Sequence, residues 1–390
     1  MPENILKSNL NDYAFEQGPI RPPSESYSLL IRVTRNCPWN KCQFCGVYKG
    51  SKFELRSAEE VMADIDNVRH IADAIRSATG NGSNPEAVRE LAAQVYYEGN
   101  YDMSVRNVAL WLWAGAKSIF LQDANSLIVK TPELVRILKY LRESFPQIER
   151  ITSYARSKTA AQKSQQEMND IHAAGLSRLH IGMESGSDKV LAMIDKGVTG
   201  ADHIAGGRKV KESGISLSEY IMPGIGGRTL SEEHALDSAA VLNQIDPDFI
   251  RLRSTVLSPR YLIWAKVESG EFVPQPDDEV VIEIRKFIEH LEVNSYLASD
   301  HIMNLLPEVE GKFPGAKSSC LAVIDNYLSL PESERTNYRL GRRMGIYEKL
   351  EDIRDLFKRS QVESMIESLN RDGKRDPEDI INRLKTRLAI

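Results

Sequence analysis

The stretch YSLLIRVTRNCPWNKCQFC, residues 27–45, joins a short apolar run to three closely spaced cysteines. Its first part is rich in aliphatic and β-branched residues, a composition that predicts a β-strand. Cys37, Cys42 and Cys45 follow at the carboxyl end of that strand. The stretch therefore predicts a strand that delivers three thiols to a single loop.

Downstream of this strand, helical and strand patterns alternate. Ser57 and Glu60 form a capping-box pattern, which predicts the start of a helix. An insertion is expected at about 71–116, and after it the alternation becomes regular. The five further strands are predicted at SIFLQDAN (118–125), RITSYAR (150–156), RLHIGMES (178–185), LSEYIMPG (217–224) and DFIRLRSTV (248–256).

Six strands separated by helices predict an α/β fold with a parallel sheet curved into a partial (β/α)6 barrel. The expected organisation is an N-terminal arm at 1–28, the partial barrel at 29–270 and a helical C-terminal region at 271–390. In such folds the functional site lies at the carboxyl ends of the strands. The cysteines and the side chains of Gln122, Asp123, Arg156 and Glu184 fall at those ends.

The three cysteines form a C-x4-C-x2-C loop. Three thiolates can hold three irons of a 4Fe-4S cluster and leave the fourth iron open to another ligand. A structural zinc site completed by Cys320 or a histidine is the alternative, because short cysteine spacings suit both metals. Cys320 itself is expected to be a small buried residue.

The cysteine loop, with Phe44 before its last cysteine, and the segment LHIGMESGSDKVLAMIDKG (179–197) resemble the radical SAM (S-adenosylmethionine) domain. This domain is shared by the elongator catalytic subunit, the MiaB methylthiotransferases and NifB, and the resemblance covers roughly Tyr27 to Gly270. It implies a 4Fe-4S cluster and SAM as cofactors, and an electron donor such as flavodoxin or ferredoxin. The cluster would cleave SAM to a 5'-deoxyadenosyl radical that abstracts hydrogen from a substrate.

The resemblance also implies roles for individual residues. Phe44 would pack at the adenine, and Glu184 would reach the ribose or the methionine end of SAM. Gln122 and Asp123 occupy the place of the Gly-Gly-Glu motif that holds the methionine amino group, while Ser153 and Arg156 sit where SAM carboxylate or hydroxyl contacts are common. The chain departs from the family pattern twice, because the usual spacing is C-x3-C-x2-C and Gln122-Asp123-Ala124 replaces Gly-Gly-Glu.

Composition limits the class of partner. The formal charge of −5 comes from interspersed acids and bases, which gives no global field for nucleic acid or for an anionic membrane. The chain has neither an apolar run of membrane-spanning length nor a signal-peptide pattern at its start, so a cytoplasmic protein without a membrane partner is expected. A small-molecule substrate is expected, and a nucleic-acid substrate is not indicated.

Arg251 and Arg253 alternate with apolar residues on the last predicted strand and should share one face of it. Because buried guanidinium groups need partners, at least one of them is predicted to hold an acidic substrate. Three hypotheses follow: a radical SAM enzyme of unidentified substrate, a non-catalytic zinc-stabilised binding module, and a radical SAM group transferase acting on tRNA. A metal assay separates the first two.

Overall fold

The computed structural model describes residues 10–80, 84–97, 100–371 and 376–388. These residues divide into two compact units. The first holds the described residues within 1–40, 47–181 and 208–217, and the second holds those within 41–46, 182–207 and 218–390. Among the described helices, none has the length and apolar composition that crossing a membrane requires.

The first unit is built on parallel strands in the order β1-β4-β5-β6. Their bounds are β1 Leu29–Arg32, β4 Ser118–Gln122, β5 Arg150–Ala155 and β6 Leu176–Glu184, and the last three residues of β6 belong to the second unit. A short antiparallel pair, β2 Thr34–Arg35 and β3 Glu54–Leu55, flanks the cysteine loop. Arg32 pairs in register with Gln122, so β1 and β4 end side by side.

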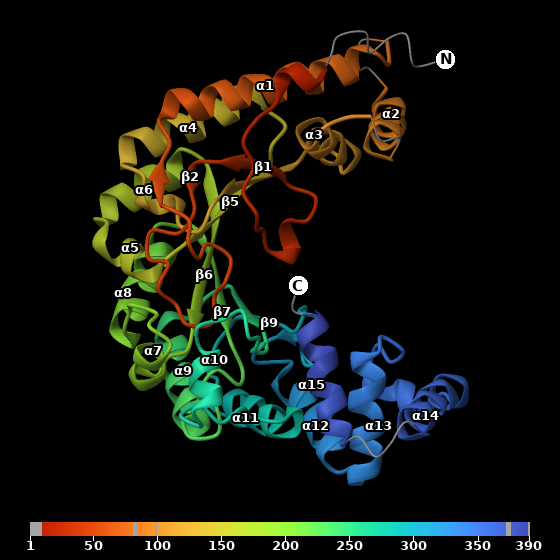
Figure 1. Cartoon of the computed structure of the whole chain (residues 1–390). Helices are drawn as coiled ribbons and strands as arrows, with labels where there is room; N and C mark the ends of the chain where they lie inside the picture. The colour runs from red at the N-terminus through yellow and green to blue at the C-terminus, as the bar shows by residue number, and fades with distance from the viewer. Residues whose placement is uncertain (1–9, 81–83, 98–99, 372–375, 389–390) are drawn as a thin grey trace. The chain divides into compact units, whose positions relative to one another are not determined.

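Helices follow the strands of this unit as the sequence predicts. Ser57 caps α1 through the complete capping box with Glu60, and α1 packs against α3 and α4 (Figure 1). The predicted insertion at 71–116 consists of the end of α1 followed by two helices. The helices are α1 Ala58–Ser77, α2 Pro85–Tyr97, α3 Met103–Trp113, α4 Thr131–Ser144, α5 Ser157–Gln162 and α6 Gln165–Ala173, with short 3-10 turns at Leu10–Tyr13, Pro23–Glu25 and Ser126–Ile128.

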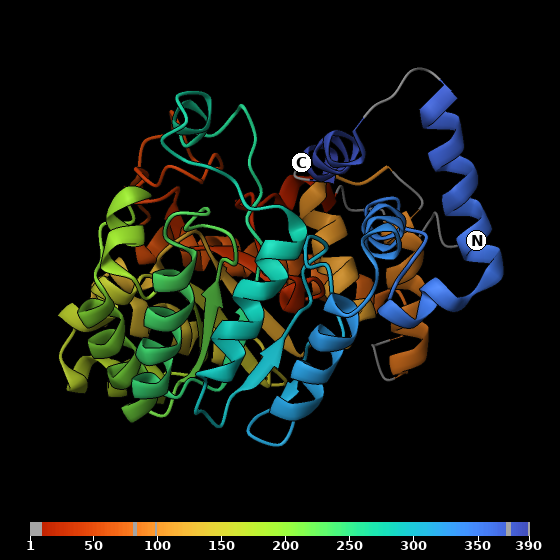
Figure 2. The same cartoon turned by 90° about the horizontal axis from the view of Figure 1, so that it is seen from below.

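The second unit contains β7 Ser216–Ile221, whose first two residues lie in the first unit, and β8 Phe249–Leu252 and β9 Tyr296–Ala298 parallel to it. β10 Gly311–Lys312 pairs antiparallel with β9. Helix α11 packs against both α9 and α12 (Figure 2). The helical elements are α7 Asp188–Met193, α8 Gly200–Glu212 (partly in the first unit), α9 Ser231–Ile245, α10 Trp264–Glu268, α11 Asp277–Glu289, α12 Lys317–Leu328, α13 Glu332–Arg343, the 3-10 turn Leu350–Arg354, α14 Leu356–Arg371 and α15 Pro377–Leu388.

The predicted alternation of strands and helices is confirmed, with two corrections. The last predicted strand ends at Leu252, so Arg253 lies beyond β8 and does not share a strand face with Arg251. The region after residue 270 is not purely helical, because β9 and β10 extend the strand set. Apolar residues of the predicted strands are buried at Ile31, Val33, Leu179, Ile181, Met183, Ile250 and Leu252, whereas Val256 lies beyond β8 and is partly exposed.

Candidate cofactor site

The cysteine loop follows β2 directly, and its three cysteines are free thiols that are partly exposed to solvent. The Asn40 N–H lies 3.5 Å from the Cys37 sulfur, and the Cys45 N–H donates to the Cys42 carbonyl at 3.4 Å. Cysteines that form no disulfide bond and that solvent can reach suit an iron-sulfur cluster, so the donor chemistry fits the predicted cofactor. Across the described parts of the chain, no three His, Cys, Asp or Glu side chains already stand in metal-binding geometry. The ligand assignment therefore rests on the type and spacing of the thiols.

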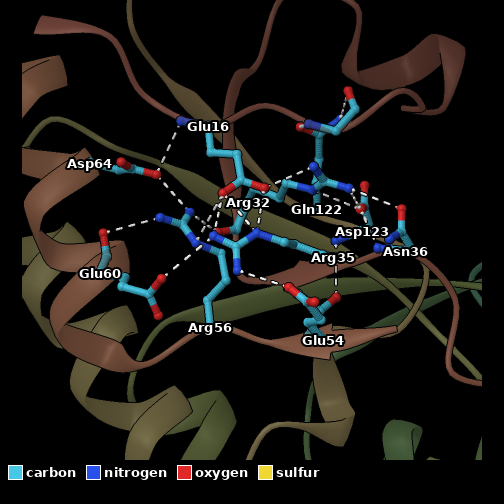
Figure 3. A network of polar contacts seen from close by, with 12 residues as sticks. Glu16, Arg32, Arg35, Asn36, Glu54, Arg56, Glu60, Asp64, Gln122 and Asp123 are labelled. Carbon is cyan, nitrogen blue, oxygen red and sulfur yellow. Dashed lines mark hydrogen bonds and ion pairs between the residues drawn. The ribbon is translucent and has the colours of Figure 1, made fainter. Parts of the chain in front are cut away.

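Asp123 lies immediately beyond β4 and is fully buried in the first unit. Its Oδ2 accepts hydrogen bonds from the Asn36 N–H at 2.8 Å and from Arg32 Nε and Nη2 at 2.8 and 2.5 Å (Figure 3). Burial raises the pKa of Asp123, while the Asn36 N–H and the Arg32 guanidinium oppose that shift. The Asp123 side chain therefore bonds residues that lead into the cysteine loop.

Gln122 is also fully buried, and its amide pairs with the N-terminal arm. Its Oε1 accepts from the Gly18 N–H at 2.8 Å, and its Nε2 donates to the carbonyls of Gly18 and Ile20 at 3.0 and 2.7 Å. Both donor hydrogens of the side-chain amide are therefore used by main-chain carbonyls of the arm. The assignment of Gln122 and Asp123 to the methionine amino group stays a prediction, and their described contacts are with protein.

A network of ion pairs anchors the arm beside these residues. Glu16 accepts hydrogen bonds from Arg32 at 2.9 Å and from Arg35 at 2.7 to 2.9 Å, and it lies 3.5 Å from Arg56. Figure 3 shows these three arginines converging on the carboxylate. The Arg35 guanidinium is the main cause that lowers the pKa of Glu16. Glu16 is thus held as a carboxylate that ties the arm to β1, β2 and the strand-helix connection at Arg56.

Ser153 and Arg156, the other first-unit residues assigned to SAM, differ in accessibility. The Ser153 hydroxyl is fully buried and bonds the Leu121 carbonyl at 3.0 Å and the Ser126 hydroxyl at 2.6 Å. Arg156 is partly exposed, and its guanidinium lies 4.9 Å from the centre of the Trp39 ring, within the cysteine loop. Arg156 is therefore better placed than Ser153 to contact a ligand.

In the second unit, main-chain hydrogen bonds fix the segment around Phe44. The Gln43 N–H donates to the Ile194 carbonyl at 2.9 Å, and the Gln43 carbonyl accepts from the Ile263 N–H at 3.0 Å. The Phe44 ring packs against a buried apolar cluster and lies 5.7 Å from Lys196 Nζ. The cluster consists of Val190, Ile194, Met222, Ile225, Ile263 and Phe272.

Glu184 ends β6 and pairs with Lys196 at 2.8 Å, both side chains being only 12% exposed. Its backbone is left-handed, with φ of 65°, and its carbonyl accepts from the Met222 N–H at 3.0 Å. Gly182 leaves room for the pair, because a Cβ there would stand 2.2 Å from Glu184 Oε1 and 3.1 Å from Lys196 Nζ. The phenyl ring of Phe44 and this ion pair thus share Lys196 as a neighbour.

Glu219 on β7 is a second carboxylate near this pair. It is fully buried, and within the described chain neither of its carboxylate oxygens has a hydrogen-bond partner. Burial raises its pKa well above the usual range; Lys196 lowers that pKa and Glu184 raises it. An orphaned carboxylate beside a buried ion pair is unusual, and it marks this end of β7 as a place where a polar ligand group would be stabilised.

Buried side chains of α9 and α11 support the turns around Glu184. His234 Nδ1 lies 2.9 Å from the Ser185 hydroxyl, and His234 Nε2 lies 3.6 Å from Glu283. Glu283 accepts from the Gly224 N–H at 2.7 Å and from the Ser231 hydroxyl at 2.6 Å. Burial lowers the pKa of His234, which favours the neutral imidazole. These contacts hold the turn after β6 and the turn after β7.

Lys196, Glu219, His234 and Glu283 are absent from the site predicted by the sequence. Glu219 had a usable signal, because it is an acidic residue inside an otherwise apolar strand, LSEYI. Lys196 lies in the segment 179–197 that resembles the radical SAM domain, but the resemblance implies no role for it. His234 and Glu283 lie on helices far along the chain, where nothing in the local pattern distinguishes them from surface residues.

The structure places Arg251 and Arg253 differently. Arg251 is buried on β8 and pairs with Asp300, while the side chain of Arg253 is exposed. Asp300 supplies the acid that a buried Arg251 requires, so these contacts do not call for an anionic substrate. Their assignment to an acidic substrate remains a prediction. Cys320 is fully buried on α12, as expected, and burial raises its pKa to about 11.

A model of the radical SAM superfamily matches residues 31–239, which is more than half of the chain. The chain belongs to the radical SAM superfamily. Members of this superfamily are enzymes that use a 4Fe-4S cluster and SAM, so the predictions of an enzyme and of these two cofactors are confirmed. The predicted α/β fold class of the radical SAM type is confirmed as well.

Two curated relatives of this radical SAM enzyme are tRNA uridine(34) acetyltransferases. The protein from Methanocaldococcus infernus is 23% identical over 119 residues, and the one from Methanocaldococcus jannaschii is 21% identical over 118 residues. Each match covers 30% of this chain and 22% of the relative. The chain thus spans about a fifth of the length of the curated relatives that it matches.

Solved structures of radical SAM proteins are similar at a lower level. Elp3 from Methanocaldococcus infernus, with an N-terminal deletion, gives a TM-score of 0.40 at 16% identity and covers 56% of this chain and 54% of its own. The methyltransferase TsrM from Kitasatospora setae gives a TM-score of 0.43 at 16% identity, and the match covers 66% of this chain and 43% of TsrM. Coproporphyrinogen III oxidase (HemN) from Escherichia coli gives a TM-score of 0.43 at 14% identity, and the match covers 67% of this chain and 52% of HemN.

Proposed function

We propose that Cys37, Cys42 and Cys45 bind the 4Fe-4S cluster of this radical SAM enzyme, which removes a hydrogen atom from a substrate. The observation that carries the proposal is the loop itself: three cysteines within nine residues that form no disulfide bond, directly after the first strands of the matched region. When bound, the cluster and SAM supply an electron-driven cleavage that gives methionine and a 5'-deoxyadenosyl radical. The protein's own residues position SAM and the substrate and exclude water.

The proposed polar contacts to SAM are assigned within each unit taken by itself. In the second unit, Glu184 and Lys196 offer a carboxylate and an ammonium group beside the Phe44 ring, and Phe44 offers an apolar surface for the adenine. Arg156, stacked on Trp39, is the first-unit candidate. We assign Ser153, Gln122 and Asp123 a supporting position behind these residues, because their polar atoms contact protein.

The proposed organisation follows from the site. We assign residues 29–270 to the cysteine loop and the cofactor contacts, residues 1–28 to an N-terminal arm whose described part begins at Leu10, and residues 271–390 to a C-terminal region whose described residues are mainly helical. Glu283 accepts a hydrogen bond from the turn after β7, so the C-terminal region also supports the proposed cofactor site. An external electron donor, such as flavodoxin or ferredoxin, is required for turnover.

Reconstitution tests the ligand assignment. Anaerobically reconstituted protein should contain about four irons per chain, and replacing Cys37, Cys42 or Cys45 by Ala should abolish the cluster. Cys320→Ala is the matched control and should keep its iron, because this thiol is buried on α12. The measurements are iron and sulfide content and the 5'-deoxyadenosine formed from SAM. Stoichiometric zinc, or full iron content in a variant of the loop, contradicts the proposal.

The substrate class has two candidates. The charge balance favours a small molecule, whereas the names of the two curated relatives favour tRNA. The expectation that nucleic acid is not a partner therefore has no support from these relatives. Addition of tRNA to the reduced holoenzyme with SAM separates the candidates. A tRNA-dependent rise in 5'-deoxyadenosine formation supports the second, and an unchanged rate contradicts it.

A further inference from the structure

Asp123 joins the end of β4 to the residue that precedes the first cysteine. Its Oδ2 accepts the Asn36 N–H at 2.8 Å, and Asn36 has a left-handed φ of 68°. Asn adopts this conformation more readily than most non-glycine residues, and the hydrogen bond at its N–H helps to fix it there. The same oxygen takes two hydrogen bonds from Arg32, which lies at the end of β1. One carboxylate therefore fixes the backbone where the chain turns from the strands toward Cys37.

We propose that Asp123 is a positioning residue that sets the start of the cysteine loop, so that Cys37 is presented to the cluster. This inference rests on the proposed role of Cys37 as a ligand. It gives Asp123 a function different from the methionine contact implied by the family resemblance. The acceptor oxygen works through the loop backbone and touches neither SAM nor the reacting atoms.

The N-terminal arm closes the other side of this carboxylate. Within the described chain, Asp123 Oδ1 is buried without a hydrogen-bond partner, and a Cβ at Gly18 would stand 1.9 Å from it. Gly18 itself is fastened by the Gln122 amide through both its N–H and its carbonyl. The arm thus packs directly on Asp123, and only a glycine at position 18 lets the side chain keep its position.

Tyr48 supports the cysteine loop from a second direction. Its side chain is 3% exposed, and its carbonyl accepts a hydrogen bond from Asn40 Nδ2 at 2.6 Å. The Asn40 N–H lies 3.5 Å from the Cys37 sulfur. The residues that follow Cys37 thus have their own support, and Asp123 acts on the residue that precedes it.

The test compares Asp123→Ala with Glu25→Ala. Glu25 is a fully buried carboxylate of the same unit, and it pairs with Ser28, Arg150 and His180 instead of the loop. Cluster loss to an iron chelator is followed through the visible absorbance of reconstituted protein, and thermal unfolding of the apo protein is followed in parallel. Loss of a hydrogen bond to a charged group should make Asp123→Ala lose its cluster about tenfold faster or more, while Glu25→Ala keeps the wild-type rate.

Two further variants separate positioning from folding. Asp123→Asn keeps an acceptor for the Asn36 N–H and should retain most of the cluster and the wild-type electron paramagnetic resonance spectrum with SAM. Gly18→Ala displaces the carboxylate without altering it and should reproduce the faster loss. Equal rates for Asp123→Ala and Glu25→Ala, or a wild-type rate in Gly18→Ala, overturn the proposal. Full iron content in Cys37→Ala overturns the ligand assignment instead, so the two failures are distinguishable.

Discussion

Gly182 shows how the absence of one side chain can shape a charged site. The space above it holds the Glu184–Lys196 pair, which a Cβ would disrupt. Removing one partner of a buried ion pair leaves an uncompensated charge, which costs about 3 to 5 kcal/mol. Lys196 also faces Glu219, so its loss would leave two buried carboxyl groups without a cation. The pair is therefore sensitive to small changes at three positions.

We predict that Lys196→Ala weakens SAM binding about tenfold to hundredfold, because a hydrogen bond to a charged group is lost. Gly182→Ala should weaken it similarly by displacing the pair, and both variants should keep their iron. SAM affinity of the reconstituted protein, measured by equilibrium dialysis, checks this.

Lys189→Ala is the matched control for these variants, because Lys189 lies on the same segment and pairs with Glu233 at the surface. Surface pairs of this kind contribute little to stability, so its SAM affinity should not change. Equal affinities in Lys196→Ala and the wild type would remove Lys196 from the proposed cofactor contacts.

Among the elements, α9 and α11 act as supports for the turns that follow β6 and β7. His234 on α9 reaches Ser185, and Glu283 on α11 reaches Gly224. Both side chains are almost fully buried, so their contacts are made in a poorly hydrated environment where hydrogen bonds are strong. These two helices therefore also fix the backbone at the carboxyl ends of the strands.

His234 predicts a pH dependence of stability. Burial places its pKa in the folded protein below the value of about 6.5 for an unfolded chain. The unfolded state then binds more protons in acid, so this contribution is complete above about pH 6.5 and is lost as the pH falls below it, by at most about 1.4 kcal/mol per pH unit. Urea unfolding of the apo protein between about pH 7.5 and 5.5 measures the slope.

His234→Gln should flatten this slope, because the titrating group is gone. His290→Gln is the control, since His290 is exposed and, among its described contacts, its ring bonds only the Lys286 carbonyl. It should leave the slope unchanged. The same slope in His234→Gln and the wild type would mean that other groups produce the pH dependence.

At the scale of the whole molecule, the sequence predicted the repeating β/α pattern because each long element carries its own period. The strands β9 and β10, of three and two residues, are too short to show a period. The end of the last predicted strand was misplaced because RLRSTV continues the alternation past Leu252, where β8 ends although the Arg253 N–H still donates to the Ile221 carbonyl of β7 at 2.9 Å. Local patterns thus predicted which elements form better than where they end.

The candidate site divides in the same way. The thiols and Glu184 stand in short motifs, so spacing and resemblance could indicate them. The partners of Gln122 and Asp123 could not be predicted, since the Gln122 amide bonds a residue 104 positions earlier in the chain. A resemblance can indicate the location of a side chain, while its contacts depend on which distant segment packs against it. Here that segment is the N-terminal arm, whose Gly18 and Ile20 contact Gln122.

The amide of Gln122 gives the arm a property normally associated with a strand. By accepting from the Gly18 N–H and donating to the Gly18 carbonyl, this side chain imitates a neighbouring peptide group. Gly18 lies in no helix or strand, yet its amide proton is hydrogen-bonded to a fully buried partner. In hydrogen–deuterium exchange, the Gly18 amide proton should exchange as slowly as the amide protons of the parallel strands. A single side chain thus extends the slowly exchanging core into an irregular segment.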